Sequence, residues 1–241
     1  MSLPSVLVVH GALGSAEQMQ PMVDALVATS RFATVRAVEL PGHGRTPLAE
    51  GQAFNMDVFA DAIADATDAA MDAAAPPIVF GYSMGGYAAL LLAARAPGLL
   101  GGIVTLGTML RWTPEVAAHA ASRLDPTVVA AKVPAFAATL AARHEQAGGW
   151  ETVMHRTAAL LRGLGDAPPL TEATFAAIDC PVHLLVGEKD DSVTIADCES
   201  AVLAMRHATA TMLPGMPHPI ERVPGDTVAG FVLRVRGETA G

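Results

Sequence analysis

A serine flanked by glycines stands in the sequence GYSMGG, residues 81–86. The apolar run IVF precedes it, and an alanine- and leucine-rich stretch typical of a helix follows. A strand–G-x-S-x-G–helix arrangement forces the serine into a strained turn, which needs small neighbours and lifts the hydroxyl clear of the sheet. The pattern therefore predicts that Ser83 is a nucleophile.

A nucleophilic serine requires a base, and the base requires an acid that orients it. In this architecture the acid follows the serine in the chain, and the histidine follows the acid. The segment HLLVGEKDDSV, residues 183–193, offers Glu188, Asp190 and Asp191 directly after an apolar run. The later segment LPGMPHPIERV, residues 213–223, supplies His218, which we predict as the base.

Acyl transfer also needs two backbone N–H donors where negative charge develops. The residue after the nucleophile, Met84, supplies one of them. The loop after the first apolar run, VVHGALGS, places Gly11 where the backbone must bend close to the substrate, and we assign the second donor to the N–H of Ala12. We expect His10, in the same loop, to organise its backbone rather than to take part in the chemistry.

Short apolar runs alternate with longer helix-patterned segments, which is typical of parallel strands joined by helices. We predict an α/β fold with a mostly parallel sheet of about six strands flanked by helices. The predicted strands are residues 5–9, 34–40, 78–82, 102–106, 182–186 and 209–213, and the helices between and after them are 17–28, 56–74, 84–94, 194–206 and 227–235.

Residues 111–178 interrupt this alternation, because they contain no convincing strand pattern. They are predicted to form several helices broken at Pro114, Pro126, Pro134, Gly148-Gly149 and Pro168-Pro169. The simplest organisation is one core domain of residues 1–110 and 180–241, with a helical cap of residues 111–179 inserted into it. Arg111, Trp112 and His155 of this cap, together with Tyr87 of the core, are candidates to line a substrate pocket.

The formal net charge of −9 argues against nucleic acid or an anionic membrane surface as a partner, since both favour clustered Lys and Arg. No apolar stretch approaches the roughly 20 residues that span a bilayer. The N-terminus lacks the basic region of a signal peptide. These features favour a cytoplasmic protein that acts on a small molecule, and the sequence gives no indication of an oligomeric state.

Five segments occur in the order found in the α/β-hydrolase superfamily: HGALGS, LPGHGRT, GYSMGG, LLVGEKDDSV and GMPHPIERVP. Together they resemble its serine hydrolases with a helical cap. The resemblance implies a Ser83–Asp190–His218 triad, in which Asp190 matches the family's G-E-x-D position and Asp191 is the alternative. It also implies neither a metal nor an organic cofactor. Only one strand fits before the HG loop, so we expect a reduced sheet whose strands are all parallel.

The function that follows is a carboxylesterase (EC 3.1.1) that cleaves a small or medium ester through an acyl-enzyme. One alternative is a carbon–carbon bond hydrolase or lyase, of the menaquinone-pathway or meta-cleavage type, with the same triad. It would require a cap cation aimed at Ser83, such as Arg111, Arg123 or His155. Thioesters, lactones, amides and perhydrolysis use the same residues, and a non-catalytic receptor on a hydrolase scaffold is a further alternative.

Overall fold

The sheet is the centre of the computed structural model, which describes residues 3–68 and 75–235. Its six strands run in the order β2-β1-β3-β4-β5-β6, and every neighbouring pair is parallel. They are β1 (Val6–Val9), β2 (Val35–Val38), β3 (Ile78–Tyr82), β4 (Gly102–Leu106), β5 (Val182–Lys189) and β6 (Ala208–Pro217). The predicted α/β fold with an all-parallel six-stranded sheet is confirmed.

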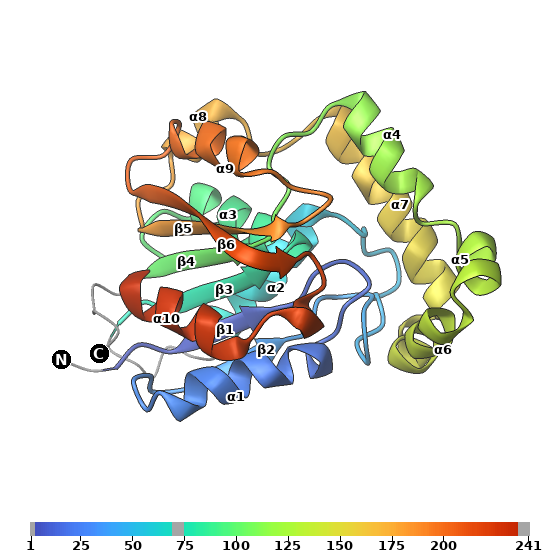
Figure 1. Ribbon diagram of the computed structural model, residues 1–241, viewed down its shortest axis with the longest axis horizontal. Helices are drawn as coiled ribbons and strands as arrows, with labels where there is room; N and C mark the ends of the chain where they lie inside the picture. The colour runs from blue at the N-terminus through green and yellow to red at the C-terminus, as the bar shows by residue number, and fades with distance from the viewer. Residues whose placement is uncertain (1–2, 69–74, 236–241) are drawn as a thin grey trace.

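Helices cover both faces of this sheet (Figure 1). Successive strand side chains point to opposite faces, so Val6 and Val8 pack with one set of helices while Leu7 and Val9 pack with the other. The first set is α1 (Gln20–Ala28) and α10 (Gly225–Val235). The second set is α2 (Met56–Asp68), α3 (Met84–Arg95), α8 (Glu172–Ala176) and α9 (Ile195–Val202). Burial on both faces explains why the central strands are continuous apolar runs.

Two helix starts agree with their capping residues. The Oδ1 atom of Asn55 accepts a hydrogen bond from the N–H of Val58 at 3.0 Å, at the start of α2. A 3-10 turn, η1 (Glu17–Met19), precedes α1, and the Ser15 hydroxyl accepts from the N–H of Gln18 at 3.3 Å. Residues 56–68 of the predicted helix 56–74 are helical, and residues 69–74 lie outside the described ranges.

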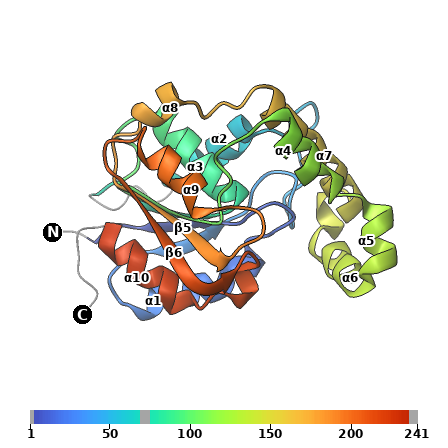
Figure 2. The same cartoon turned by 45° about the horizontal axis from the view of Figure 1, so that its top comes forward.

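The segment 111–178 is helical, as predicted. It contains α4 (Pro114–Ser122), α5 (Pro126–Lys132), α6 (Pro134–Arg143), the 3-10 turn η2 (Glu145–Ala147) and α7 (Trp150–Asp166), followed by α8. Three of the predicted breaks, at Pro114, Pro126 and Pro134, are helix starts, because a proline in the first turn has no N–H to leave unpaired. Figures 1 and 2 place α4 to α7 together, beyond the carboxyl ends of the strands.

The helices α6 and α7 share a small hydrophobic cluster of their own, which includes Leu140, Trp150 and Met154. Leu13, from the loop after β1, is the member of this cluster that comes from outside 111–179. By contrast, Phe175 of α8 belongs to the hydrophobic cluster that α2, α3 and α9 form with one face of the sheet. Leu160 and Leu164 of α7 also belong to that cluster, and the division into core and cap stays a prediction.

The observed ends of several elements differ from the predicted ones. β5 continues to Lys189 and β6 to Pro217, whereas the apolar runs end at Val186 and Leu213, because the strand ends beyond the core are partly exposed and carry no apolar signal. β2 is shorter than predicted, and α9 ends at Val202 rather than at residue 206. Within the described ranges, no helix is both long and apolar enough to cross a bilayer.

Candidate active site

Ser83 occupies a strained turn between β3 and α3. Its backbone has φ 49° and ψ −115°, a conformation that residues other than glycine rarely adopt and that costs about 1–3 kcal/mol. A Cβ atom at Gly81 would lie 2.5 Å from the Cα of Gly86, and one at Gly85 would lie 2.5 Å from the carbonyl oxygen of His10. The small neighbours that the sequence pattern requires are therefore needed here for steric reasons.

Hydrogen bonds to β4 and its following loop hold this turn in place. The N–H of Ser83 donates to the carbonyl of Leu106 at 2.8 Å. The carbonyl of Ser83 accepts from the Thr108 hydroxyl at 2.9 Å and from the N–H of Gly86 at 3.0 Å. Because both backbone groups of Ser83 are bonded, the surroundings offset the cost of the strained conformation.

Asp190 and His218 form a close pair at the ends of β5 and β6. Nδ1 of His218 lies 2.7 Å from Oδ2 of Asp190. The other carboxylate oxygen of Asp190 accepts from the N–H groups of Ser192 at 2.8 Å and Val193 at 3.1 Å. The Asp190 side chain is only 1% exposed. A buried carboxylate fixed on one side by backbone donors can orient a histidine ring on the other.

The two other carboxylates of this segment are engaged elsewhere. Asp191 is 66% exposed and lies 3.2 Å from the guanidinium of Arg123. Glu188 accepts a hydrogen bond from the N–H of Gly215 at 2.7 Å. The contacts therefore favour Asp190 over Asp191 as the partner of His218.

Gly107 brings the Asp190–His218 pair and the Ser83 turn to the same edge of the sheet. A Cβ atom at Gly107 would lie 3.0 Å from Nδ1 of His218 and 3.1 Å from Oδ2 of Asp190. Gly107 directly follows Leu106, whose carbonyl binds the N–H of Ser83. The hydroxyl of Tyr82, the residue before the serine, also donates to the carbonyl of His218 at 3.1 Å.

The loop after β1 passes beside the nucleophile. A Cβ atom at Gly11 would lie 3.1 Å from the Cβ of Ser83, so the backbone at Gly11 and Ala12 runs close to it. His10 is fully buried, and its Nδ1 donates to the carbonyl of Gly11 at 2.8 Å while its Nε2 accepts from the N–H of Leu40 at 3.0 Å. No hydrogen bond joins the N–H of Ala12 to another described residue.

Residues 3–222 match the family described as serine aminopeptidase S33, a family of α/β hydrolases. The chain belongs to this family. The match covers nearly all of the sequence, including the serine turn and the segment of His218. The protein is therefore an α/β-fold hydrolase.

Curated relatives of this hydrolase include the pimeloyl-[acyl-carrier protein] methyl ester esterase of Neisseria meningitidis serogroup C. It is 33% identical over 112 residues, which are 46% of this chain and 40% of the relative. The corresponding protein of serogroup A is 32% identical over 47% of this chain and 33% of its own length. The chain thus spans less than half the length of the curated relatives it matches.

Solved structures share the fold over the whole chain. NosK from Streptomyces actuosus has a TM-score of 0.76 and 25% identity, and the match covers 98% of this chain and 100% of NosK. A putative lipase from Acinetobacter baumannii also has a TM-score of 0.76, with 17% identity over 98% of this chain and 85% of the lipase. At 17% identity the second likeness shows the fold alone.

The four residues considered for a substrate pocket of the hydrolase have other contacts. Arg111 is 70% exposed, and its Nε lies 3.1 Å from Asp197. Tyr87 is buried, and its hydroxyl accepts from the N–H of Leu170 at 3.2 Å. Burial raises the pKa of Tyr87 to about 12. The indole N–H of Trp112 donates to the carbonyl of Met109 at 3.2 Å, and His155 is exposed on α7. These contacts do not require a substrate, and a pocket role for the four residues stays a prediction.

Three residues near the nucleophile were not identified from the sequence: Gly107, Thr108 and Tyr82. Gly107 carried a usable signal, since a glycine directly after an apolar strand marks a close approach of another group. The contacts of Thr108 and Tyr82 are made to residues distant in sequence, and no local pattern indicates them.

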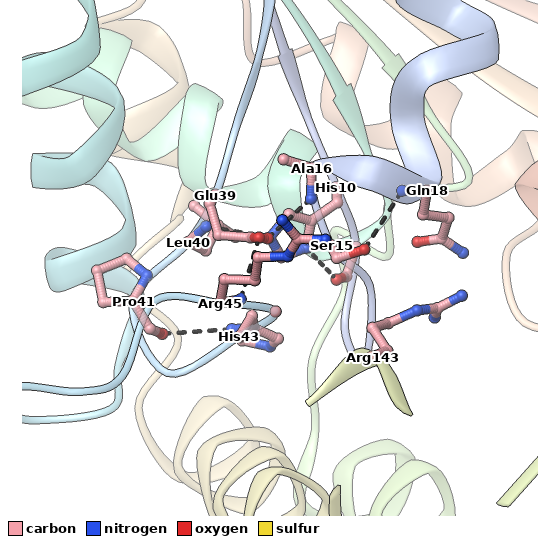
Figure 3. Close-up of polar contacts among 12 residues, drawn as sticks. His10, Ser15, Ala16, Gln18, Glu39, Leu40, Pro41, His43, Arg45 and Arg143 are labelled. Carbon is pink, nitrogen blue, oxygen red and sulfur yellow. Dashed lines mark hydrogen bonds and ion pairs between the residues drawn. The ribbon is translucent and has the colours of Figure 1, made fainter. Parts of the chain in front are cut away.

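A surface cavity of about 710 Å³ lies apart from Ser83, between η1, β2 and the end of α6. Its lining includes Glu39, Arg45 and Arg143, and Figure 3 shows Glu39 and Arg45 beside His10, with Arg143 on the side of Gln18. Burial raises the pKa of Glu39, but the adjacent His10 ring and the N–H groups of Ala16 and Arg45 outweigh it and leave that pKa below its usual value. Within the described residues, no group of three or more His, Cys, Asp or Glu side chains could hold a metal ion.

Proposed function

We propose that this hydrolase cleaves small or medium carboxylic esters through an acyl-enzyme, with Ser83 as nucleophile, His218 as base and Asp190 as the orienting acid. One observation carries the proposal. The Asp190–His218 pair meets Gly107, which directly follows the residue whose carbonyl holds the N–H of Ser83. This arrangement supports a triad whose members follow β3, β5 and β6.

The first step is proton transfer from Ser83 to His218. Asp190 accepts a hydrogen bond at Nδ1 of His218, which keeps the proton on that nitrogen and leaves Nε2 able to accept. As Nε2 takes the hydroxyl proton, the Ser83 oxygen attacks the ester carbonyl. The nearby carboxylate stabilises the imidazolium that forms, without itself becoming protonated.

The N–H groups of Ala12 and Met84 then stabilise the negative charge on the tetrahedral intermediate. Met84 begins α3, so the positive end of the helix dipole adds to its N–H. When the intermediate collapses, His218 gives its proton to the leaving alkoxide. His218 next activates a water molecule that releases the acid and frees Ser83.

The curated relatives support an ester as the bond that is cleaved, because they are named as methyl ester esterases. For this chain we take from the relatives only that the alcohol released from the ester is small. The carbon–carbon hydrolase or lyase alternative required a cap cation beside Ser83. Arg111 and Arg123 instead pair with Asp197 and Asp191 at the surface, and His155 is exposed on α7, so the contacts give that alternative no support.

Hydrolysis of p-nitrophenyl esters and of methyl esters with two to twelve acyl carbons tests the proposal. Ser83→Ala should lose about 10⁶ in kcat, the loss seen when a comparable nucleophile is removed. Ser200→Ala, on the exposed side of α9, is the matched control and should keep wild-type turnover. Turnover that survives in Ser83→Ala, or a wild type that cleaves none of these esters, would contradict the proposal.

A further inference from the structure

The loop that carries the N–H of Ala12 forms a tight turn with an unfavourable residue in it. The N–H of Gly14 donates to the carbonyl of Gly11 at 3.1 Å, which closes a four-residue turn over residues 11–14. Leu13, at the third position, has φ 57°. That position favours glycine when φ is positive, because a side chain there meets its own backbone. Contacts from elsewhere must therefore hold this turn.

Two consecutive residues at the end of α6 supply these contacts. Nη1 of Arg143 donates to the carbonyl of Leu13 at 2.7 Å, and Nε2 of His144 donates to the same oxygen at 3.0 Å. The Leu13 side chain also packs into the cluster of Leu140, Trp150 and Met154. The backbone and the side chain of Leu13 are thus both bound by the segment predicted to be the cap.

His144 connects this turn to a second loop. The N–H of Gly44, in the turn after β2, donates to Nδ1 of His144 at 3.0 Å. Nδ1 must then lack a proton, so the neutral ring carries its proton on Nε2 and can donate to Leu13. His144 is fully buried, and burial lowers its pKa, which favours this neutral form. One uncharged ring therefore fixes two loops at the carboxyl ends of β1 and β2.

We propose that His144 and Arg143 are positioning residues for the oxyanion site: by holding the carbonyl of Leu13, they keep the turn of residues 11–14 in the conformation that aims the N–H of Ala12 at the substrate oxygen. This inference rests on the proposed function, because it assigns a role within the same reaction. Neither side chain acts on the substrate itself. Their effect is on the transition state, where the oxyanion forms.

The test compares four variants by kcat, KM and inhibition by a trifluoromethyl ketone that carries the acyl chain of the best ester. Such a ketone adds to the serine and places an oxyanion in the same site. His144→Leu removes both hydrogen bonds, His144→Gln restores a donor close to the position of Nε2, and Arg143→Met keeps the aliphatic stem. Arg162→Met, exposed on α7, is the control.

His144→Leu should lower kcat about 10- to 100-fold, below the 10²–10³ that loss of an oxyanion donor costs, and should weaken the ketone by a similar factor. KM should change little, His144→Gln should recover most of the loss, and Arg143→Met should lose about tenfold. A residue that merely supports the cap would change the melting temperature and KM, and leave kcat and ketone inhibition unchanged. If His144→Leu does not fold, Arg143→Met and His144→Gln decide the question.

Different experimental results would refute the positioning role and the proposed function. If the wild type cleaves esters through Ser83 while folded variants of Arg143 and His144 keep kcat and ketone inhibition within twofold, the positioning role is refuted and the esterase stands. If the wild type shows no Ser83-dependent turnover on esters, the proposed function itself is refuted.

Discussion

Substitution of Gly107 by alanine should damage catalysis more than stability. The added Cβ would lie 3.0 Å from Nδ1 of His218 and 3.1 Å from Oδ2 of Asp190, whereas ordinary contacts begin near 3.4 Å. The pair must therefore move by a few tenths of an ångström. A misplacement of about 1 Å costs roughly 10²-fold in rate. On the same scale, a displacement of a few tenths of an ångström costs roughly 3- to 10-fold, and we expect kcat/KM to fall by about this factor in Gly107→Ala.

The same substitution also has a backbone cost. Gly107 has φ 63°, and an alanine in this left-handed region costs roughly 1–2 kcal/mol. For a chain of this size, that corresponds to a fall of about 2–8 °C in melting temperature. Loss of activity through unfolding must therefore be separated from loss through displacement of the pair.

Gly98→Ala makes that separation, because Gly98 has φ 82° and no atom within 4 Å of an added Cβ. It has the same kind of backbone strain without any contact to His218 or Asp190. Steady-state ester hydrolysis and thermal unfolding should show both variants destabilised and only Gly107→Ala impaired in turnover. Wild-type kcat/KM in a folded Gly107→Ala, or an equal loss in Gly98→Ala, would refute the reasoning.

Two further predictions follow from the carboxylates and the buried histidines. Asp190→Asn should lower kcat about 10⁴-fold by removing the acceptor that fixes the His218 tautomer, while Asp191→Asn should stay within about twofold in the same ester assay; the reverse pattern would make Asp191 the acid. Burial lowers the pKa of His43 and of His144 below 6.5, so the unfolded chain binds more protons, and the free energy of unfolding should fall as pH drops from about 6.5 toward these lowered values. Urea unfolding at pH 7.5 and 5.5 measures this fall in the free energy of unfolding. The fall should be smaller in His43→Phe, and an equal fall in wild type and variant would contradict the role of His43.

The parts of the fold that local sequence could predict are those enclosed by the core. Strands β3 and β4 were predicted with their observed ends, because both are buried throughout and stop at a change in composition. The exposed ends of β5 and β6 gave no such signal. At the site, the serine turn was predictable because its glycines are needed within five residues of Ser83.

The contacts between the site and the helices of residues 111–178 were not predictable in this way. Arg143 and His144 bind a carbonyl 130 and 131 residues away in the chain. No periodicity or spacing relates positions so far apart, since the contact depends on how α6 docks beside the loop after β1. The prolines of this segment, by contrast, gave a usable local signal, because α4 and α5 begin at Pro114 and Pro126, where breaks were predicted.

The place of Leu13 in the cluster of Leu140, Trp150 and Met154 has a consequence for engineering. Exchange of helical caps between hydrolases is an obvious route to a new substrate range, and it treats the cap as a detachable module. In this protein, a foreign segment in place of α4 to α7 would leave Leu13 without its apolar neighbours and its carbonyl without two donors. A functional chimera should therefore carry residues 11–14 over together with these helices from the same parent.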